Sequence, residues 1–178
     1  AAIDVESTTV GRLYAGYIAI LSAIPPIASF IGFSVFGISI PFIGTYRVPI
    51  GSALTSAITQ YVLGLVGVYV LALIIDALAP TFAGEKNLIQ ALKVAAYSYT
   101  AGWLAGIFAL IPGLRLLTIL GLYSFYLLYL GLPTLMKSPK EKAAGYTAVV
   151  VICAILLFWA VAAVDSAFIS RPPVPGLG

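Results

Sequence analysis

Tyr146-Thr-Ala-Val-Val-Val-Ile-Cys-Ala-Ile-Leu-Leu-Phe-Trp-Ala-Val-Ala-Ala-Val164 is a run of the chain without a single charged side chain. It lies within residues 146–169, a segment long enough to cross a hydrocarbon core of about 30 Å, which takes roughly 20 helical residues. Lipid offers no hydrogen-bond partner to the backbone, and a helix satisfies its own backbone groups. The run therefore predicts a transmembrane helix.

The composition of the whole chain agrees with a membrane protein. Of its 178 residues, 62% are hydrophobic and 8% are charged, and the mean hydropathy is +1.11, whereas a soluble domain has about 25% charged residues. A chain of this size cannot bury so much apolar surface in one core in water. The net charge of +3 is too small and too dispersed for nucleic-acid binding. We expect the lipid bilayer as solvent, with bound lipids.

Four further segments have the length and hydropathy of a membrane span. The predicted fold is all-α, a polytopic membrane protein in which residues 13–169 form a bundle of five transmembrane helices, at 13–33, 54–79, 91–111, 114–135 and 146–169. Consecutive prolines lack two backbone donors, so we expect the first helix to be kinked at Pro25-Pro26. Residues 1–12 are predicted as a cytoplasmic segment and 170–178 as an extended Pro-rich tail. The chain starts with Ala1-Ala2 and no methionine, which leaves open a longer native polypeptide.

The distribution of positive charge predicts the orientation. Five crossings place the two termini on opposite sides of the membrane. The amino-terminal side then carries six of the nine basic residues, namely Arg12, Lys86, Lys93, Lys137, Lys140 and Lys142. Since cytoplasmic loops are enriched in Lys and Arg, we predict a cytoplasmic amino terminus and a carboxyl terminus outside.

The connection between the first two predicted spans, residues 34–53, is unusually apolar. Its glycines and prolines, among them Gly37, Pro41 and Pro49, prevent a continuous helix. We expect a packed connector here; the alternative is a gate or re-entrant element.

Charged residues inside spans are costly and often functional. Asp76, near the end of the second span, and Lys93, early in the third, should lie near the same membrane boundary. We predict an intramembrane ion pair between them; the alternative is that each side chain extends separately to the interface. Asp165 has Arg47 and Arg115 as candidate partners.

Two patterns predict close packing or contacts with a partner. Ser98, Gly102 and Gly106 recur at four-residue spacing in the third span and let helix backbones approach closely. Tyr123, Tyr126 and Tyr129 recur every three residues in the fourth span. The repeat reaches the middle of the membrane, where hydroxyls need hydrogen-bond acceptors. We therefore expect this stripe of tyrosines to face other helices or a partner. The remaining tyrosines of the cytoplasmic half fit an interfacial aromatic belt.

Reactive groups are scarce in this sequence. There is no histidine, no phosphate-binding glycine-rich loop and no metal-binding motif, so we expect neither cofactor nor catalysis. We predict a non-enzymatic scaffold or accessory subunit that packs against other integral membrane proteins, in a larger complex. The alternative is a small-solute or ion transporter or channel that uses the broken first helix and Asp76.

Residues 77–100 and 122–149 resemble the Yip1 family of five-span membrane proteins, specifically its bacterial branch. The second stretch ends a span in Gly131-Leu-Pro133, continues through a Lys-rich loop and opens the next span with Gly145-Tyr146. The resemblance implies five spans, an inside amino terminus and, for a bacterial member, the inner membrane. Eukaryotic relatives bind Rab GTPases and carry an Asp-Leu-Tyr-Gly-Pro-like motif. Asp4-Val-Glu-Ser-Thr-Thr-Val-Gly-Arg-Leu-Tyr14 does not reproduce it, so the Rab-binding role is not expected here.

Overall fold

The computed structural model describes residues 9–40 and 44–168. The predicted tail, residues 170–178, and residues 1–8 of the predicted amino-terminal segment lie outside the described residues. The α-helices are α1 Val10–Leu13, α2 Ala19–Leu21, α3 Ile24–Ile31, α4 Ile50–Leu78, α5 Leu88–Ala105, α6 Tyr123–Leu135 and α7 Lys140–Phe168. Two strands, β1 Ile38–Ile40 and β2 Gly44–Tyr46, form a hairpin. Shorter turns extend the helices, with π-helical turns at Tyr14–Ile18 and Gly32–Phe36, and 3-10 segments at Ala79–Phe82, Gly106–Leu110 and Pro112–Leu122.

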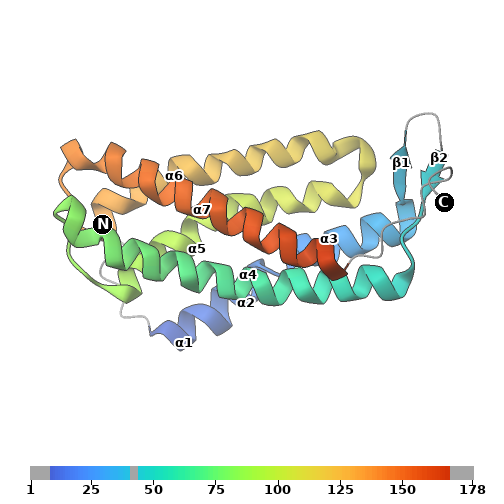
Figure 1. Cartoon of the computed structure of the whole chain (residues 1–178), viewed down its shortest axis with the longest axis horizontal. Helices are drawn as coiled ribbons and strands as arrows, with labels where there is room; N and C mark the ends of the chain where they lie inside the picture. The colour runs from blue at the N-terminus through green and yellow to red at the C-terminus, as the bar shows by residue number, and fades with distance from the viewer. Residues whose placement is uncertain (1–8, 41–43, 169–178) are drawn as a thin grey trace.

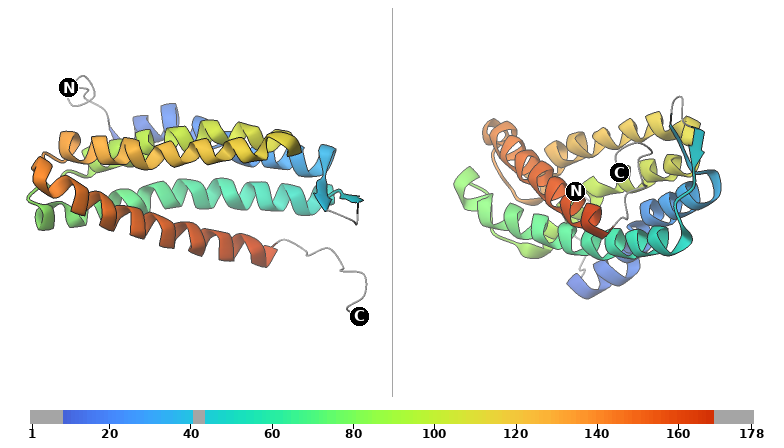
Figure 2. Two further views of the ribbon diagram at one scale, coloured as in Figure 1. Left: turned by 90° about the horizontal axis from the view of Figure 1, so that it is seen from above. Right: turned by 45° about the vertical axis from the view of Figure 1, so that its right-hand side comes forward.

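The helical segments lie side by side along one long axis, and consecutive segments run in opposite directions (Figure 1). We call the end that carries the β1–β2 hairpin and the turn at Pro112 the hairpin end. The opposite end, with residues 79–87 and 136–139, is called the lysine end. Helix α4 packs against both α5 and α7, and α7 also packs against α6. Seen from above, α5 and α6 lie on one side of α4 and α7 on the other (Figure 2).

The first segment is broken just before its two prolines. Residues Ser22 and Ala23 form a turn, and α3 starts again with Pro25 and Pro26 in its first turn. Proline fits the first turn of a helix, where its missing N–H would have no partner. The hydroxyl of Tyr61 in α4 donates to the carbonyl of Ala19, 3.1 Å away, in the turn before the break. The break is thus supported by a side chain from the neighbouring helix.

The apolar connection after this segment contains the hairpin, which the sequence did not predict. Ile38 pairs with Tyr46 and Ile40 with Gly44 in antiparallel register. Val48 N donates to Phe33 O at 3.2 Å, which ties the exit of the hairpin to the preceding helix. Residues 41–43 at its tip lie outside the described residues.

Four helices among the described residues are long and apolar enough to cross a membrane: Val10–Phe36, Ile50–Phe82, Leu116–Leu135 and Lys140–Ser166. The prediction of a helical protein with several membrane spans is confirmed. The number of five crossings is not confirmed, because α5, the third predicted span, is not one of these four helices.

Helix α5 instead forms the centre of the molecule. Nine of its residues are buried, including the run from Ala91 to Ala96, and it packs against both α4 and α6. Its N-cap is Asn87, whose side chain accepts a hydrogen bond from Gln90 N at 3.1 Å. An N-cap side chain of this kind pairs one of the backbone N–H groups that have no partner within the first turn of a helix. A helix enclosed by its neighbours can carry polar residues that a lipid-facing helix could not.

Candidate functional site

The three tyrosines Tyr123, Tyr126 and Tyr129 lie on the outer surface of α6, and we call them the tyrosine face. Their exposed fractions are 55%, 52% and 43%, and the rings of Tyr123 and Tyr126 lie 5.4 Å apart between centroids. Within residues 9–40 and 44–168, no side chain or backbone group forms a hydrogen bond with their hydroxyls. The tyrosine face therefore points away from the rest of the chain.

The opposite side of α6 explains this orientation. Leu128 and Leu132 are buried, and a Cβ on Gly131 would lie 3.5 Å from Val94 Cγ1 of α5. Because apolar and small residues of α6 pack onto α5, the tyrosines that alternate with them remain outside.

Small residues on α5, and Gly106 directly after its end, contact other segments of the same chain. Gly102 N donates to Ser124 Oγ at 3.0 Å, and a Cβ on Gly121 would lie 3.4 Å from Gly102 Cα. A Cβ on Gly106 would lie 2.7 Å from Pro25 Cγ. Ser98, one turn before Gly102 in α5, is also buried. These glycines thus bring α5 close to the 3-10 segment Pro112–Leu122 on one side and to the broken first helix on the other.

Asp76 and Lys93 lie at the lysine end, on α4 and α5. The side chain of Lys93 is 1% exposed, and Asp76 is half-buried. The Oδ1 atom of Asp76 is shielded from solvent and has no hydrogen-bond partner within the described part of the chain. Lys93 has an interaction of its own. Their ion pair stays a prediction.

Beside Asp76, the lysine end contains a cluster that the sequence did not reveal. Tyr146 of α7 is fully buried, its hydroxyl donates to Ile75 O of α4, and its ring stacks on Phe82 at 4.9 Å between centroids. The Ser138 hydroxyl donates to Phe82 O at 2.7 Å, and Lys137 pairs with Glu85 at 2.8 Å on the surface. These contacts join the two loops of this end.

Asp165 forms hydrogen bonds with α4. Among the described residues it has no arginine partner. Its carboxylate accepts hydrogen bonds from Ser56 Oγ at 3.0 Å and from Gln60 Nε2 at 3.1 Å. Arg47 is exposed, and the side chain of Arg115 lies outside the description. Ser56 and Gln60 are four residues apart and so share one face of α4, a signal that could have predicted this contact.

Two tyrosines assigned to an aromatic belt form hydrogen bonds between helices. The hydroxyls of Tyr17 and Thr100 lie 2.7 Å apart, and Tyr14 donates to Leu65 O at 3.0 Å. Both contacts join the first segment to other helices. A buried or half-buried phenol with such a partner stabilises packing; the aromatic belt stays a prediction.

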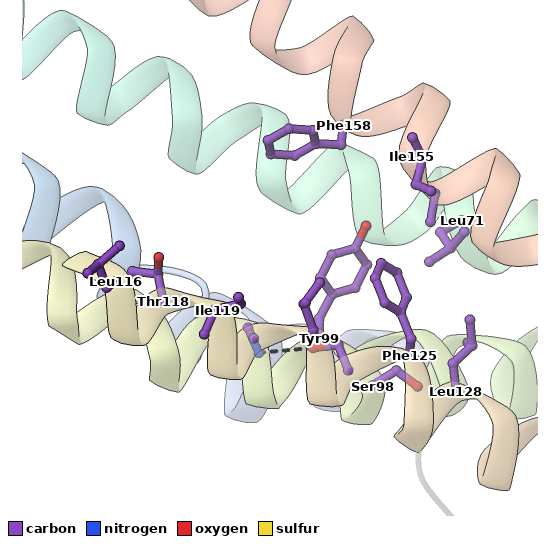
Figure 3. Close-up of a pocket in the computed structure, with 15 residues that line it drawn as sticks. Leu71, Ser98, Tyr99, Leu116, Thr118, Ile119, Phe125, Leu128, Ile155 and Phe158 are labelled. Carbon is purple, nitrogen blue, oxygen red and sulfur yellow. Dashed lines mark hydrogen bonds between the residues drawn. The ribbon is translucent and has the colours of Figure 1, made fainter. Parts of the chain in front are cut away.

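A lateral cleft of about 740 Å³ opens between α7 and the pair of α5 and α6 (Figure 3). Ile155 and Phe158 of α7 form one wall, Ile119 and Phe125 the other, and Tyr99 projects from α5 between them. A second hollow of about 320 Å³ lies at the broken first helix, next to Pro26 and Tyr61. Neither hollow is lined by Asp76. Among the described residues no three His, Cys, Asp or Glu side chains are grouped to hold a metal ion.

Comparison with known proteins identifies the family. The model of the Yip1 domain matches residues 2–162. Inner membrane protein YohC of Escherichia coli K12 is 28% identical over 149 residues, which cover 82% of this chain and 76% of YohC; YohC of Escherichia coli O6:H1 matches equally. No solved structure matches the chain. The predicted resemblance is confirmed: this membrane protein belongs to the Yip1 family.

Proposed function

We propose that this chain is a non-enzymatic scaffold or accessory subunit that packs against other integral membrane proteins through its tyrosine face. The observation that carries the proposal is the exposure of Tyr123, Tyr126 and Tyr129 on a membrane-spanning helix. Membrane proteins of the Yip1 family are not known as enzymes, which agrees with a binding role.

The depth of Tyr123 distinguishes a partner surface from an interfacial belt. Tyr123 lies twelve residues before the end of α6 at Leu135, about 18 Å along a helix, whereas half of the hydrocarbon core is about 15 Å. Its ring therefore lies beyond the boundary layer in which tyrosines face headgroups. A phenol hydroxyl without a partner in lipid is costly, and a neighbouring membrane protein supplies acceptors.

The lining of the two hollows favours a scaffold or accessory subunit over a transporter. The lateral cleft is lined mainly by apolar side chains, and neither hollow described above contains Asp76. A path for polar solutes would need polar groups along its walls. The pairing of Asp76 with Lys93, which ties α4 to α5, is part of the structural role we propose.

The test removes only the hydroxyls of the tyrosine face. The triple variant Tyr123→Phe, Tyr126→Phe, Tyr129→Phe keeps the rings, and Tyr69→Phe on α4, also exposed, serves as the matched control. After cross-linking in native membranes and extraction in a mild detergent, light scattering gives the mass of the particle. We expect a companion at fixed stoichiometry with the wild type and Tyr69→Phe, and its loss with the triple variant. A wild-type particle with the mass of one protomer contradicts the proposal.

We further infer that the chain crosses a bacterial inner membrane five times, with the lysine end in the cytoplasm. Support comes from the central position of α5 along the same axis as the other segments (Figure 1), from the excess of lysine at that end and from the inner-membrane relative. Six basic residues against three favour this orientation.

Single cysteines test the crossings. In a Cys153→Ala background, Thr81→Cys marks the lysine end, and Ile50→Cys and Leu114→Cys mark the hairpin end; none of these changes alters the charge. We expect a membrane-impermeant maleimide to label positions 50 and 114 in cells with a permeable outer membrane, and position 81 only after the inner membrane is opened. Labelling of positions 81 and 114 from the same side would show that α5 does not cross.

A further inference from the structure

The lateral cleft is a space between membrane-spanning helices rather than a solvent pocket. It extends from Leu116, at the start of the fourth segment, to Leu128 of α6. Helix α7 lies beside α6 at the lysine end and separates from it toward the hairpin end (Figure 1), so the cleft opens sideways. Ile155 and Phe158 at its mouth are 43% and 69% exposed.

The walls of the cleft are mainly apolar. Eleven of the fifteen lining residues have no polar side-chain atom, and the other four, Ser98, Tyr99, Thr118 and Ser124, carry hydroxyls. The walls continue into the exposed apolar surface of the 3-10 segment Pro112–Leu122 and of α7, which includes Leu120 and Leu156. Because this surface meets hydrocarbon in the membrane, hydrocarbon also has direct access to the cleft.

The size of the cleft decides which hydrocarbon it takes. A helix with its side chains is 10–12 Å across and rises 5.4 Å per turn, so one turn fills roughly 500 Å³. The cleft, with a volume of about 740 Å³, is too small to enclose a membrane-crossing helix of more than five turns. A slender, flexible chain fits where a helix does not.

The length of the cleft is somewhat greater than the depth of one leaflet. From Leu116 to Leu128 the backbone advances about 20 Å, given rises of 2.0 Å per residue in the 3-10 segment and 1.5 Å in α6. Half of the hydrocarbon core is about 15 Å. We propose that the lateral cleft binds one acyl chain of a phospholipid from the leaflet at the hairpin end.

The two tryptophans of the chain make this binding measurable. Trp103 is 7% exposed, and its ring stacks on that of Tyr99, a lining residue, at 5.9 Å between centroids. Trp159 is 68% exposed and meets the bulk lipid. Bromine on an acyl chain quenches tryptophan fluorescence only at close range. Quenching of Trp103 therefore reports a chain inside the cleft.

The experiment uses the full chain with Trp159→Phe, reconstituted in vesicles of phosphatidylethanolamine and phosphatidylglycerol with brominated acyl chains. We expect strong quenching of Trp103. Ala154→Phe, which fills the cleft from α7, should lose most of it, and Ala163→Phe, an exposed position of α7 outside the cleft, should lose none. If Ala154→Phe loses its helical circular dichroism, Ile155→Phe replaces it. A Trp103→Phe variant, which keeps Trp159, is the positive control.

Three results would overturn the proposal. Unquenched Trp103 in vesicles that quench Trp159 would show that no chain enters. Quenching of Trp103 that falls as the protein-to-lipid ratio rises would show a second protein copy in the cleft. Loss of quenching in Tyr99→Phe would show that the occupant is a lipid with a polar group at that depth, because an acyl chain does not need the hydroxyl.

Discussion

Gly32→Ala is expected to lower the free energy of unfolding by about 3 kcal/mol, at the upper end of the usual cost of overpacking. Gly32 is buried at the start of a π-helical turn, and a Cβ there would overlap the carbonyl oxygen of Ala109 and lie 3.4 Å from that of Leu110. Both obstacles are backbone atoms, which cannot rotate away as a side chain does. The first segment would have to move off the 3-10 segment Gly106–Leu110.

Thermal and denaturant unfolding in a mild detergent, followed by circular dichroism, measures this effect. Gly64→Ala in α4 is the matched control, because nothing lies within 4 Å of a Cβ at Gly64. Alanine is the better helix former, so this variant should gain up to about 1 kcal/mol. Equal stability of the two variants would show that the first segment does not pack so closely onto residues 106–110.

Tyr146→Ala is expected to cost about 4 kcal/mol, as truncation of a buried aromatic side chain does. Tyr146 is fully buried, and it contacts α4 through its hydroxyl and the turn after α4 through its ring. Its removal would leave a cavity where α7 joins α4. We expect the lysine end to open first, because its two loops also meet through Ser138 and Phe82.

Two further variants separate the contributions of Tyr146. Tyr146→Phe keeps the ring and loses one hydrogen bond, so its cost should be about 1 kcal/mol. Tyr126→Ala removes an exposed tyrosine and should change the stability of the isolated protomer by less than about 0.5 kcal/mol. Hydrogen exchange should show faster exchange at the start of α7 in Tyr146→Ala. A cost for Tyr146→Ala no larger than that for Tyr126→Ala would contradict its role in the core.

The elements of the fold were largely readable from hydropathy, and the contacts were not. Residues 54–79 were predicted as a span and α4 covers Ile50–Leu78. The break before Pro25 follows from the missing donors of proline. The hairpin at β1 and β2, in contrast, depends on contacts with the preceding helix such as Val48 with Phe33, and nothing in its local pattern predicts them.

The candidate site divides in the same way. The tyrosine repeat was visible, but its exposure depends on which side of α6 packs onto α5. Gly102 and Gly106 were recognised as small, but their partners Ser124 and Pro25 come from distant parts of the chain. Asp165 was noticed, and its partners Ser56 and Gln60 were missed because the expected partner was a positive charge.

The sequence alone determined that this is a membrane protein, and it determined the order of its helices along the chain. The free energy of transferring a segment from water to lipid is a sum over its residues, so it can be calculated from the sequence without knowing which residues are neighbours in the fold. The tertiary structure decided that α5, with its buried Lys93, lies at the centre, that the tyrosines face outward and that a cleft remains beside α7. Between helices in lipid, packing and hydrogen bonds replace the hydrophobic effect, and these depend on pairs of residues that only the folded chain brings together.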